Sequence, residues 1–67
     1  MYLFIKDKKE ELLDGRTIKY LSQKIGVARV TLNEILNGNR NTTKVTAFCI
    51  VKSCNADKEI EDYFIKI

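Results

Sequence analysis

The segment from Thr17 to Leu36, TIKYLSQKIGVARVTLNEIL, constrains the fold more than any other part of the chain. Its apolar residues recur at helical spacing on both sides of a glycine, at Leu21, Ile25, Val27, Leu32 and Ile35. Side chains three or four positions apart share a helix face, so these five can meet in one small core. Glycine adopts positive φ without steric cost, so Gly26 can end the first helix. The pattern predicts two short helices joined by a tight corner.

The remaining glycines and capping residues divide the chain into further helices. A first helix is predicted from the cap Asp7 to about Asp14, where Gly15 ends it, and a second from Ile18 to Ile25, capped by Thr17. A third runs from about Ala28 to Leu36 and is ended by Asn37-Gly38. A fourth runs from about Lys44 to Cys54, capped by Thr42 or Thr43, and a short fifth from Asp57 to about Asp62. The expected inward residues include Leu12, Leu13, Ala47, Ile50, Val51, Cys54 and Ile60. The fold class is therefore mainly α.

The two chain ends, MYLFI and YFIKI, differ from the helical segments because they are short and rich in β-branched and aromatic residues. They predict two strands that pair antiparallel and leave an edge to which another chain can add. An alternative starts the first helix as early as Tyr2. The aromatic residues of these ends suggest core or interface packing, or else stacking platforms for single-stranded nucleic acid.

Length and composition limit the class of protein. Sixty-seven residues make a single domain, residues 1–67, and a chain of this size buries only about 60% of its unfolded surface, so a partner subunit would add stability. The composition, 45% hydrophobic and 31% charged, is that of a soluble globular protein. With neither a secretory signal nor a span of ~20 apolar residues, the expected location is the cytoplasm.

The two cysteines do not suggest a metal site or a disulfide framework. Cys49 and Cys54 lie five apart in a helical stretch, and the chain has no histidine. Both are expected to be reduced thiols of the core type. No metal or other cofactor is expected, nor a small-molecule ligand.

Positive charge is concentrated in the middle of the chain. The net charge is +3, but residues 15–44 carry six basic side chains and one acidic side chain, whereas each flank carries three basic and four acidic ones. The excess therefore lies on the segment with the two-helix pattern. Such clustering is typical of a surface that binds a phosphate backbone.

The outward face of the third helix offers side chains that suit base edges in the major groove of DNA, the geometry of a helix-turn-helix. Arg29 matches the O6 and N7 acceptors of guanine, Asn33 can pair with adenine, and Val30 can touch a thymine methyl group. Each could instead be an ordinary surface residue. Glu34 either accepts from a cytosine amine or holds Arg29 or Arg40 in position, and the second role is favoured.

This combination of spacings resembles the Cro/repressor type of helix-turn-helix protein, the XRE-like family of bacteriophage and bacterial regulators. The resemblance spans about Leu12 to Phe64 and rests on Ser22 four residues before Gly26, on Gly26-Val27, on the apolar positions named above and on the Asn37-Gly38 ending. It implies a compact five-helix, lambda-repressor-like domain with its helix-turn-helix at about residues 17–36. It also implies a homodimer, formed through the C-terminal segment or the terminal strands, on a palindromic operator.

Carried onto this chain, the family pattern assigns two sets of DNA contacts. The base-reading set is Ala28, Arg29, Val30, Thr31, Asn33 and Glu34; the backbone-contacting set comprises Thr17 and Ile18 with the loop residues Asn37, Asn39, Arg40, Asn41, Thr42, Thr43 and Lys44. Ile18 stands where family members commonly have glutamine, so Arg16 or Lys19 would take over its phosphate contact. Leu36 occupies a usually polar place, and it either packs against the terminal strands or joins a protein interface.

The leading hypothesis is a sequence-specific transcriptional regulator that binds double-stranded DNA as a dimer. The alternative is a protein-interaction module on the same fold, such as an antitoxin-like subunit or an antirepressor, that uses Leu36 and the terminal strands. An enzyme is disfavoured, because the chain lacks a nucleophile motif and has little volume for a pocket.

Overall fold

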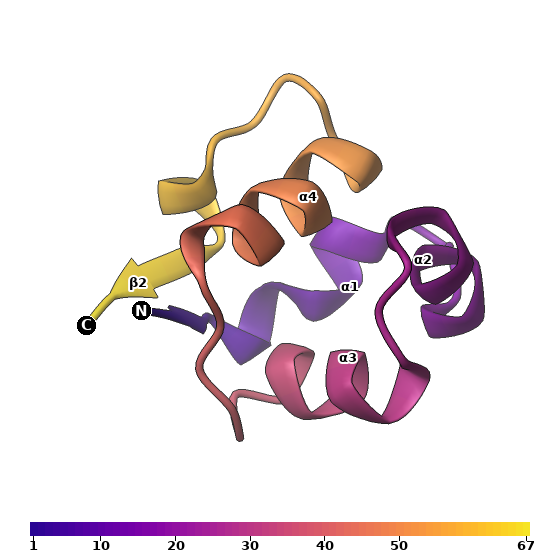
Figure 1. Ribbon diagram of the computed structural model, residues 1–67. Coiled ribbons are helices and arrows are strands. Elements are labelled where there is room, and N and C mark those ends of the chain that lie inside the picture. The colour runs from indigo at the N-terminus through magenta and orange to yellow at the C-terminus, as the bar shows by residue number, and fades with distance from the viewer.

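The computed structural model describes all residues 1–67 as four α-helices packed around one core, with a small sheet formed by the two chain ends (Figure 1). The helices are α1 (Lys9–Leu13), α2 (Ile18–Ile25), α3 (Arg29–Leu36) and α4 (Lys44–Cys54). The strands are β1 (Tyr2–Phe4) and β2 (Phe64–Lys66). The predicted mainly helical class with a terminal sheet is confirmed, with four α-helices rather than the five expected.

The predicted pair of helices around Gly26 is present as α2 and α3. The Thr17 hydroxyl accepts a hydrogen bond of 3.0 Å from the Tyr20 N–H and so caps α2 as predicted. Gly26 ends α2 with φ of 75°, in the left-handed region that glycine adopts without strain. Ala28 stands at the N-cap position of α3, with φ of −57° and ψ of 143°, and offers no side-chain cap, so the helix begins one residue later than the predicted Ala28.

The first helix departs from the prediction at both ends. A 3-10 turn, Lys6–Lys8, precedes α1, and no side chain caps either element, so the predicted Asp7 cap is wrong. The last residue of the helix is Leu13, and the C-cap residue Asp14, with φ of 49°, adopts the left-handed conformation one residue before Gly15. Aspartate tolerates this left-handed conformation better than most residues do, so it takes the place assigned to glycine.

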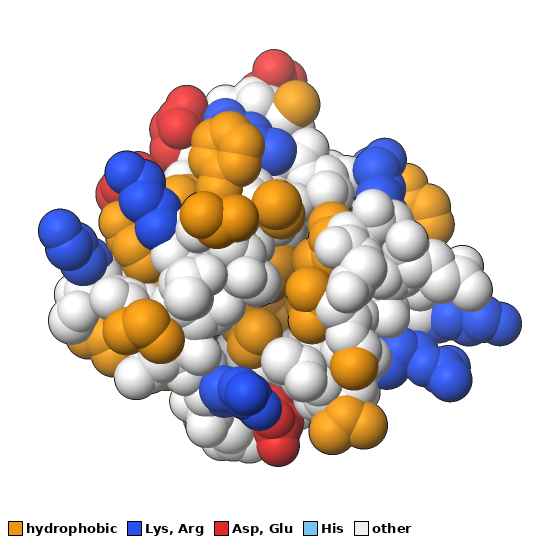
Figure 2. Space-filling model, viewed as in Figure 1, with side chains coloured by type: hydrophobic (Ala, Val, Ile, Leu, Met, Phe, Trp, Pro, Cys, Tyr) orange, Lys and Arg blue, Asp and Glu red, His pale blue; other side chains and the backbone are white.

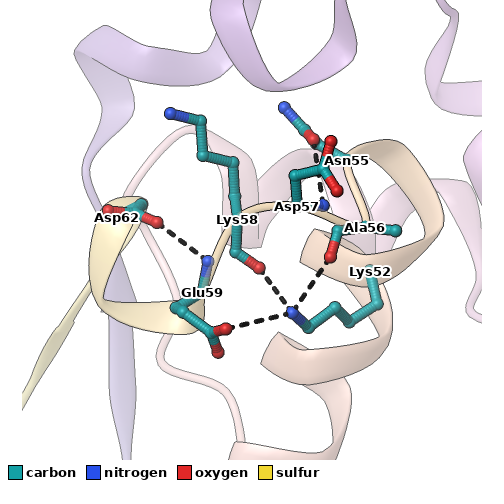
Figure 3. A network of polar contacts seen from close by, with 7 residues as sticks. All are labelled: Lys52, Asn55, Ala56, Asp57, Lys58, Glu59 and Asp62. Atoms are coloured by element: carbon teal, nitrogen blue, oxygen red, sulfur yellow. Dashed lines mark hydrogen bonds and ion pairs between the residues drawn. The ribbon is translucent and has the colours of Figure 1, made fainter.

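The predicted fifth helix, Asp57 to Asp62, is reduced to a 3-10 turn at Ile60–Asp62. In the loop before this turn, the carbonyls of Ala56 and Lys58 accept from the Lys52 ammonium group, at 3.3 and 2.6 Å, and neither accepts from a backbone N–H (Figure 3). The Asp57 N–H donates to the Asn55 side chain instead. Such local side-chain bonds compete with helix formation.

The terminal strands pair antiparallel, with Tyr2 opposite Lys66 and Phe4 opposite Phe64. The sheet prediction is therefore confirmed, and the alternative with a helix from Tyr2 is wrong. On its other side, Tyr2 forms two backbone hydrogen bonds with Thr42, of 2.8 and 2.9 Å. This bridge fixes the loop between α3 and α4 to the sheet.

One core of fifteen residues joins these elements, and all seven inward residues predicted from the helix patterns belong to it. The aromatic residues of the strands are buried as well, with Phe4 in edge contact with Phe64 at 5.1 Å. The expectation of two core-type thiols is wrong for Cys49, which is exposed, whereas Cys54 is buried. No helix has both the length and the apolar character needed to cross a membrane.

The backbone at Gly26 yields a stability prediction. A Cβ at this position would meet no atom within 4 Å, so Gly26→Ala should destabilise the chain through its positive φ alone, by about 1 kcal/mol. Gly26→Asn should cost less, because asparagine tolerates that conformation better. Urea unfolding of the two variants tests this, and equal stabilities would contradict it.

The two thiols should react at different rates. Cys49 is exposed, whereas Cys54 is buried and burial raises the pKa of its thiol, an effect that Arg16 and Lys24 partly offset. At about pH 8 the folded chain should show one fast and one slow thiol towards a disulfide reagent, with rates at least ~10-fold apart. Cys49→Ser should remove the fast phase and Cys54→Ser the slow one; the opposite assignment would contradict the packing of α4.

Candidate nucleic-acid interface

The outward face of α3 carries side chains that the protein itself leaves without contacts. Arg29, Val30 and Asn33 are exposed, and Val30 keeps 72% of its surface accessible. No hydrogen bond or ion pair involves the side chains of Arg29 or Asn33. The inward face of the same helix packs into the core through Leu32, Ile35 and Leu36, each of which has at most 2% of its surface exposed. The helix is thus anchored on one side and free on the other.

The corner before α3 is held by a side-chain hydrogen bond that residue spacing does not predict. The Ser22 hydroxyl donates a hydrogen bond of 2.6 Å to the Val27 carbonyl, across Gly26. The bond satisfies a carbonyl that lies between the two helices. A small hydroxyl residue four positions before the glycine was noted as a family feature, but its partner could not be read from spacing.

The C-terminal end of α3 closes with a Schellman motif. The Asn39 N–H donates to the Glu34 carbonyl at 2.9 Å and the Gly38 N–H to the Ile35 carbonyl at 3.1 Å, with Gly38 at φ of 77°. The Asn37 side chain accepts a bond of 3.0 Å from Lys9 of the first helix, a partner that sequence spacing could not indicate. The loop therefore leaves α3 in a fixed direction.

Glu34 pairs with Arg40 rather than with Arg29. The Arg40 guanidinium lies 2.9 Å from a Glu34 carboxylate oxygen, and both side chains are about half exposed. One of the two partners considered from the sequence is thereby selected. The pair neutralises the only acidic side chain of the central basic segment, and it leaves Arg29 unpaired.

The loop from Asn37 to Lys44 lies next to α3, and most of its predicted contact residues are exposed. Asn37, Asn39, Arg40, Asn41, Thr43 and Lys44 are exposed. Thr43 caps α4 by accepting from the Thr46 N–H at 3.3 Å. Thr42 differs, since it is only 6% exposed and both its backbone groups bond to Tyr2. Its part is to position the loop.

The predicted contacts before and within α2 are more mixed. Lys19 is exposed, but Ile18 is half-buried against the core. The Arg16 side chain donates 3.1 Å to the Leu13 carbonyl at the end of α1 and is also half-buried. The Thr17 hydroxyl is occupied as the helix cap. Near the start of α2, Lys19 is therefore the charged side chain that is exposed and makes no hydrogen bond within the protein.

A shallow hollow of about 280 Å³ lies between α3 and the start of α4. Its polar lining comes from the exposed ends of these elements and includes Thr31, Thr43, Thr46, Arg40 and Asn41. Thr31, which was assigned to base reading, is half-buried here. Of the assigned base-reading residues, Ala28, Arg29, Val30 and Asn33 thus form the exposed ridge, while Thr31 and Glu34 lie at its side.

Charge is distributed unevenly over the surface. In Figure 2 the acidic side chains gather at the top and upper left, beside the end of α4 and the turn that follows it. The lower right carries basic side chains without acidic neighbours, over the region of α2 and α3. One acidic group lies at the bottom, next to a basic one, as expected for the single pair in this region.

Comparison of the chain with protein-family models, with curated proteins and with solved structures gives no match. The interpretation of this surface therefore depends on its own geometry and charge.

Removal of the Ser22 hydroxyl should loosen the corner. Ser22→Ala leaves the Val27 carbonyl without its donor and should lower the free energy of unfolding by about 1 kcal/mol. Ser53→Ala is the matched control, because that half-buried hydroxyl makes no hydrogen bond in the structure. Chemical denaturation should separate the two variants, and an unchanged stability for Ser22→Ala would show that the bond contributes nothing.

Proposed function

We propose that this chain is a sequence-specific regulator of transcription that binds double-stranded DNA, with α3 inserted in the major groove. Its helical body would be a lambda-repressor-like domain of the Cro/repressor type, in which the short turn after α4 replaces the fifth helix. Two copies would bind a palindromic operator and act by occupying it. The resemblance noted in the sequence and the observations below support this proposal.

The observation that carries the proposal is the exposure of Val30 on an otherwise well-packed helix. An aliphatic side chain with 72% of its surface in water gains nothing in the isolated protein. Beside it lie Arg29 and Asn33, which have unused donors and acceptors. An apolar group flanked by such side chains matches the edge of a base pair, which offers a methyl group beside hydrogen-bonding atoms.

The roles in this proposal follow from the freedom of each side chain. Arg29 has no partner in the protein, so its planar guanidinium is available for the two acceptors of guanine. Asn33, about one turn further along α3, can address adenine. Glu34 keeps Arg40 near the groove margin, where a paired arginine can still donate to phosphate from its other nitrogens.

The phosphate contacts come from the surroundings of α3. Lys44 lies in the first turn of α4, where unpaired backbone N–H groups add positive potential to its ammonium group. Asn39 and Asn41 supply amide donors in the adjoining loop, and Lys19 supplies a charge near the start of α2. Thr42 is left out of this set because it is buried.

The alternative, a protein-interaction module, depends on Leu36 and the terminal strands as contacts, and the first of these is excluded. Leu36 is completely buried in the core, so it cannot be part of an external interface. A charged residue at Leu36 would unfold the core and would not separate the two hypotheses. Ile65 is exposed, and a partner could contact it, but that surface is compatible with a dimeric DNA-binding protein.

Selection of bound duplexes from a random pool tests the proposal directly. The wild-type chain should enrich one related set of sequences, and Arg29→Ala should lose discrimination at one base pair, by about 1–3 kcal/mol. Absence of any enrichment at low salt would contradict sequence-specific binding. Equal weakening on every sequence would instead assign Arg29 to a phosphate.

Lys44→Ala should affect all duplexes alike. Loss of one phosphate contact should weaken binding uniformly and reduce the slope of log affinity against log salt by about 1. Lys58→Ala is the charge-matched control, because Lys58 lies in the loop beyond α4, at the opposite end of the molecule from α3 (Figure 1). Similar effects of the two substitutions would reduce the role of Lys44 to net charge alone.

A further inference from the structure

The hollow between α3 and the start of α4 has a mixed lining. Its apolar part comes from Met1, Val27 and Ile35. Its polar part comes from α3, from the loop that follows and from the start of α4, and consists of Thr31, Arg40, Asn41, Thr42, Thr43 and Thr46. In Figure 2 apolar side chains are visible in the middle of the face shown, between α4 and α3, with polar side chains around them. Ligand sites combine an apolar lining with a few polar groups in this way.

One hydroxyl group of the hollow is nearly buried and has no partner. Only 6% of the Thr42 surface is exposed, and its backbone groups bond to Tyr2, but its side chain makes no hydrogen bond within the chain. No completely buried side-chain oxygen of the protein lacks a partner, so the Thr42 hydroxyl oxygen belongs to the small exposed part of this residue. Because Thr42 lines the hollow, its hydroxyl can donate to a molecule bound there.

The charges of the hollow favour an anion. Arg40 is the only charged side chain that lines it, and the bond to Glu34 uses one of the five N–H donors of the guanidinium group. Thr43 and Thr46 place the start of α4 in the lining as well. The first N–H groups of a helix have no acceptor within it, and they give this end of α4 a positive potential.

The size and the mixed lining restrict the kind of anion. The volume of about 280 Å³ lies just below the ~300–1,000 Å³ of pockets for drug-sized ligands, so the occupant must be small. An inorganic anion would leave Val27 and Ile35 uncovered. A neutral apolar molecule would leave the Thr42 hydroxyl and the Arg40 donors unused. A carboxylate on a short apolar chain fits both parts of the lining.

We propose that this hollow binds a small organic anion, a carboxylate with a short apolar chain, and that the bound anion opposes the binding of DNA. The carboxylate lies at the start of α4, where it accepts from the Thr42 hydroxyl and is attracted by Arg40. The apolar chain covers Val27 and Ile35. Residue spacing does not bring these segments together, so the sequence alone predicts no small-molecule ligand.

The effect on DNA rests on the proposed function. Arg40 and the start of α4 belong to the phosphate contacts of that proposal, and Thr31 is part of α3 itself. A carboxylate in the hollow takes the donors and the positive potential that a DNA phosphate would use. The ligand and the duplex therefore compete, and each weakens the binding of the other by the same factor.

Titration of the isotope-labelled chain with hexanoate, followed by nuclear magnetic resonance without DNA, tests the site. Saturable shift changes are expected at the amides of Thr42 and Thr43 and at the methyl groups of Val27 and Ile35. Hexanoate should bind at least ~10-fold more tightly than acetate, which lacks the apolar chain, and than hexanol, which lacks the charge. Equal binding of hexanoate and acetate, shift changes outside the hollow only, or tighter binding of inorganic phosphate would overturn the proposal.

Substitutions in the lining test the two contacts separately. Thr42→Val keeps the shape of the side chain and breaks no hydrogen bond of the protein, so it should weaken hexanoate binding at least ~5-fold while urea unfolding stays unchanged. Thr42→Ser keeps the hydroxyl and is the matched control, which should bind like the wild type. Val27→Thr should weaken hexanoate at least ~3-fold and leave acetate unchanged. Wild-type affinity in either Thr42→Val or Val27→Thr would overturn the proposed contacts.

The competition with DNA is measured on the selected duplex. At equal ionic strength, saturating hexanoate should weaken duplex binding at least ~5-fold relative to acetate, and Thr42→Val should abolish this difference. Duplex binding that hexanoate leaves unchanged would overturn the competition. A chain that binds hexanoate in the hollow but no duplex overturns the proposed function alone, whereas a chain that binds duplex but no hexanoate overturns this inference alone.

Discussion

The packing of α2 against α3 across Gly26 is the constraint on which the rest of the structure depends. Leu21 and Leu32 are completely buried on the two sides of this corner, and Ser22 ties the intervening backbone to α2. A helix of eight residues is too short to persist alone in water, so α3 exists because its inner face is held. The same anchoring keeps its outer side chains in a defined array.

The rest of the chain can be understood as support for this short helix. The Schellman motif ends α3, the Tyr2–Thr42 bridge fixes the loop that follows, and Thr43 starts α4 directly beyond it. Groups that could bind phosphate are thus positioned by hydrogen bonds rather than left on a flexible loop. Such pre-organisation lowers the conformational entropy lost on binding.

Helix positions could be predicted from the sequence where local chemistry determines them. Thr17, Gly26 and Thr43 mark their helix boundaries through short-range sterics and capping, and α2 and α4 have the bounds expected from them. The prediction failed after Cys54, where the carbonyls of Ala56 and Lys58 accept from the Lys52 side chain and no helical backbone bonds form at them. It failed again at Asp7, where the chain leaving β1 enters a 3-10 turn without any side-chain cap.

The candidate interface was predicted unevenly for similar reasons. The exposure of Val30 followed from helical periodicity, since Val30 lies across the helix from Leu32 and Ile35. Leu36 lies seven residues after Arg29 on the same side of the helix, so periodicity alone did not predict its burial. The burial of Thr42 and the bond from Lys9 to Asn37 depend on segments that are distant in sequence, and no periodicity encodes such contacts. The choice of Arg40 over Arg29 by Glu34 also required the path of the loop.

The most direct measurement of the central claim is nuclear magnetic resonance of the isotope-labelled chain bound to its selected duplex. Insertion of α3 in the major groove predicts contacts between the Val30 methyl groups and a thymine methyl group, together with the largest shift changes at Arg29 and Asn33. Shift changes confined to the terminal strands or to the exposed face of α4, with α3 unaffected, would contradict it.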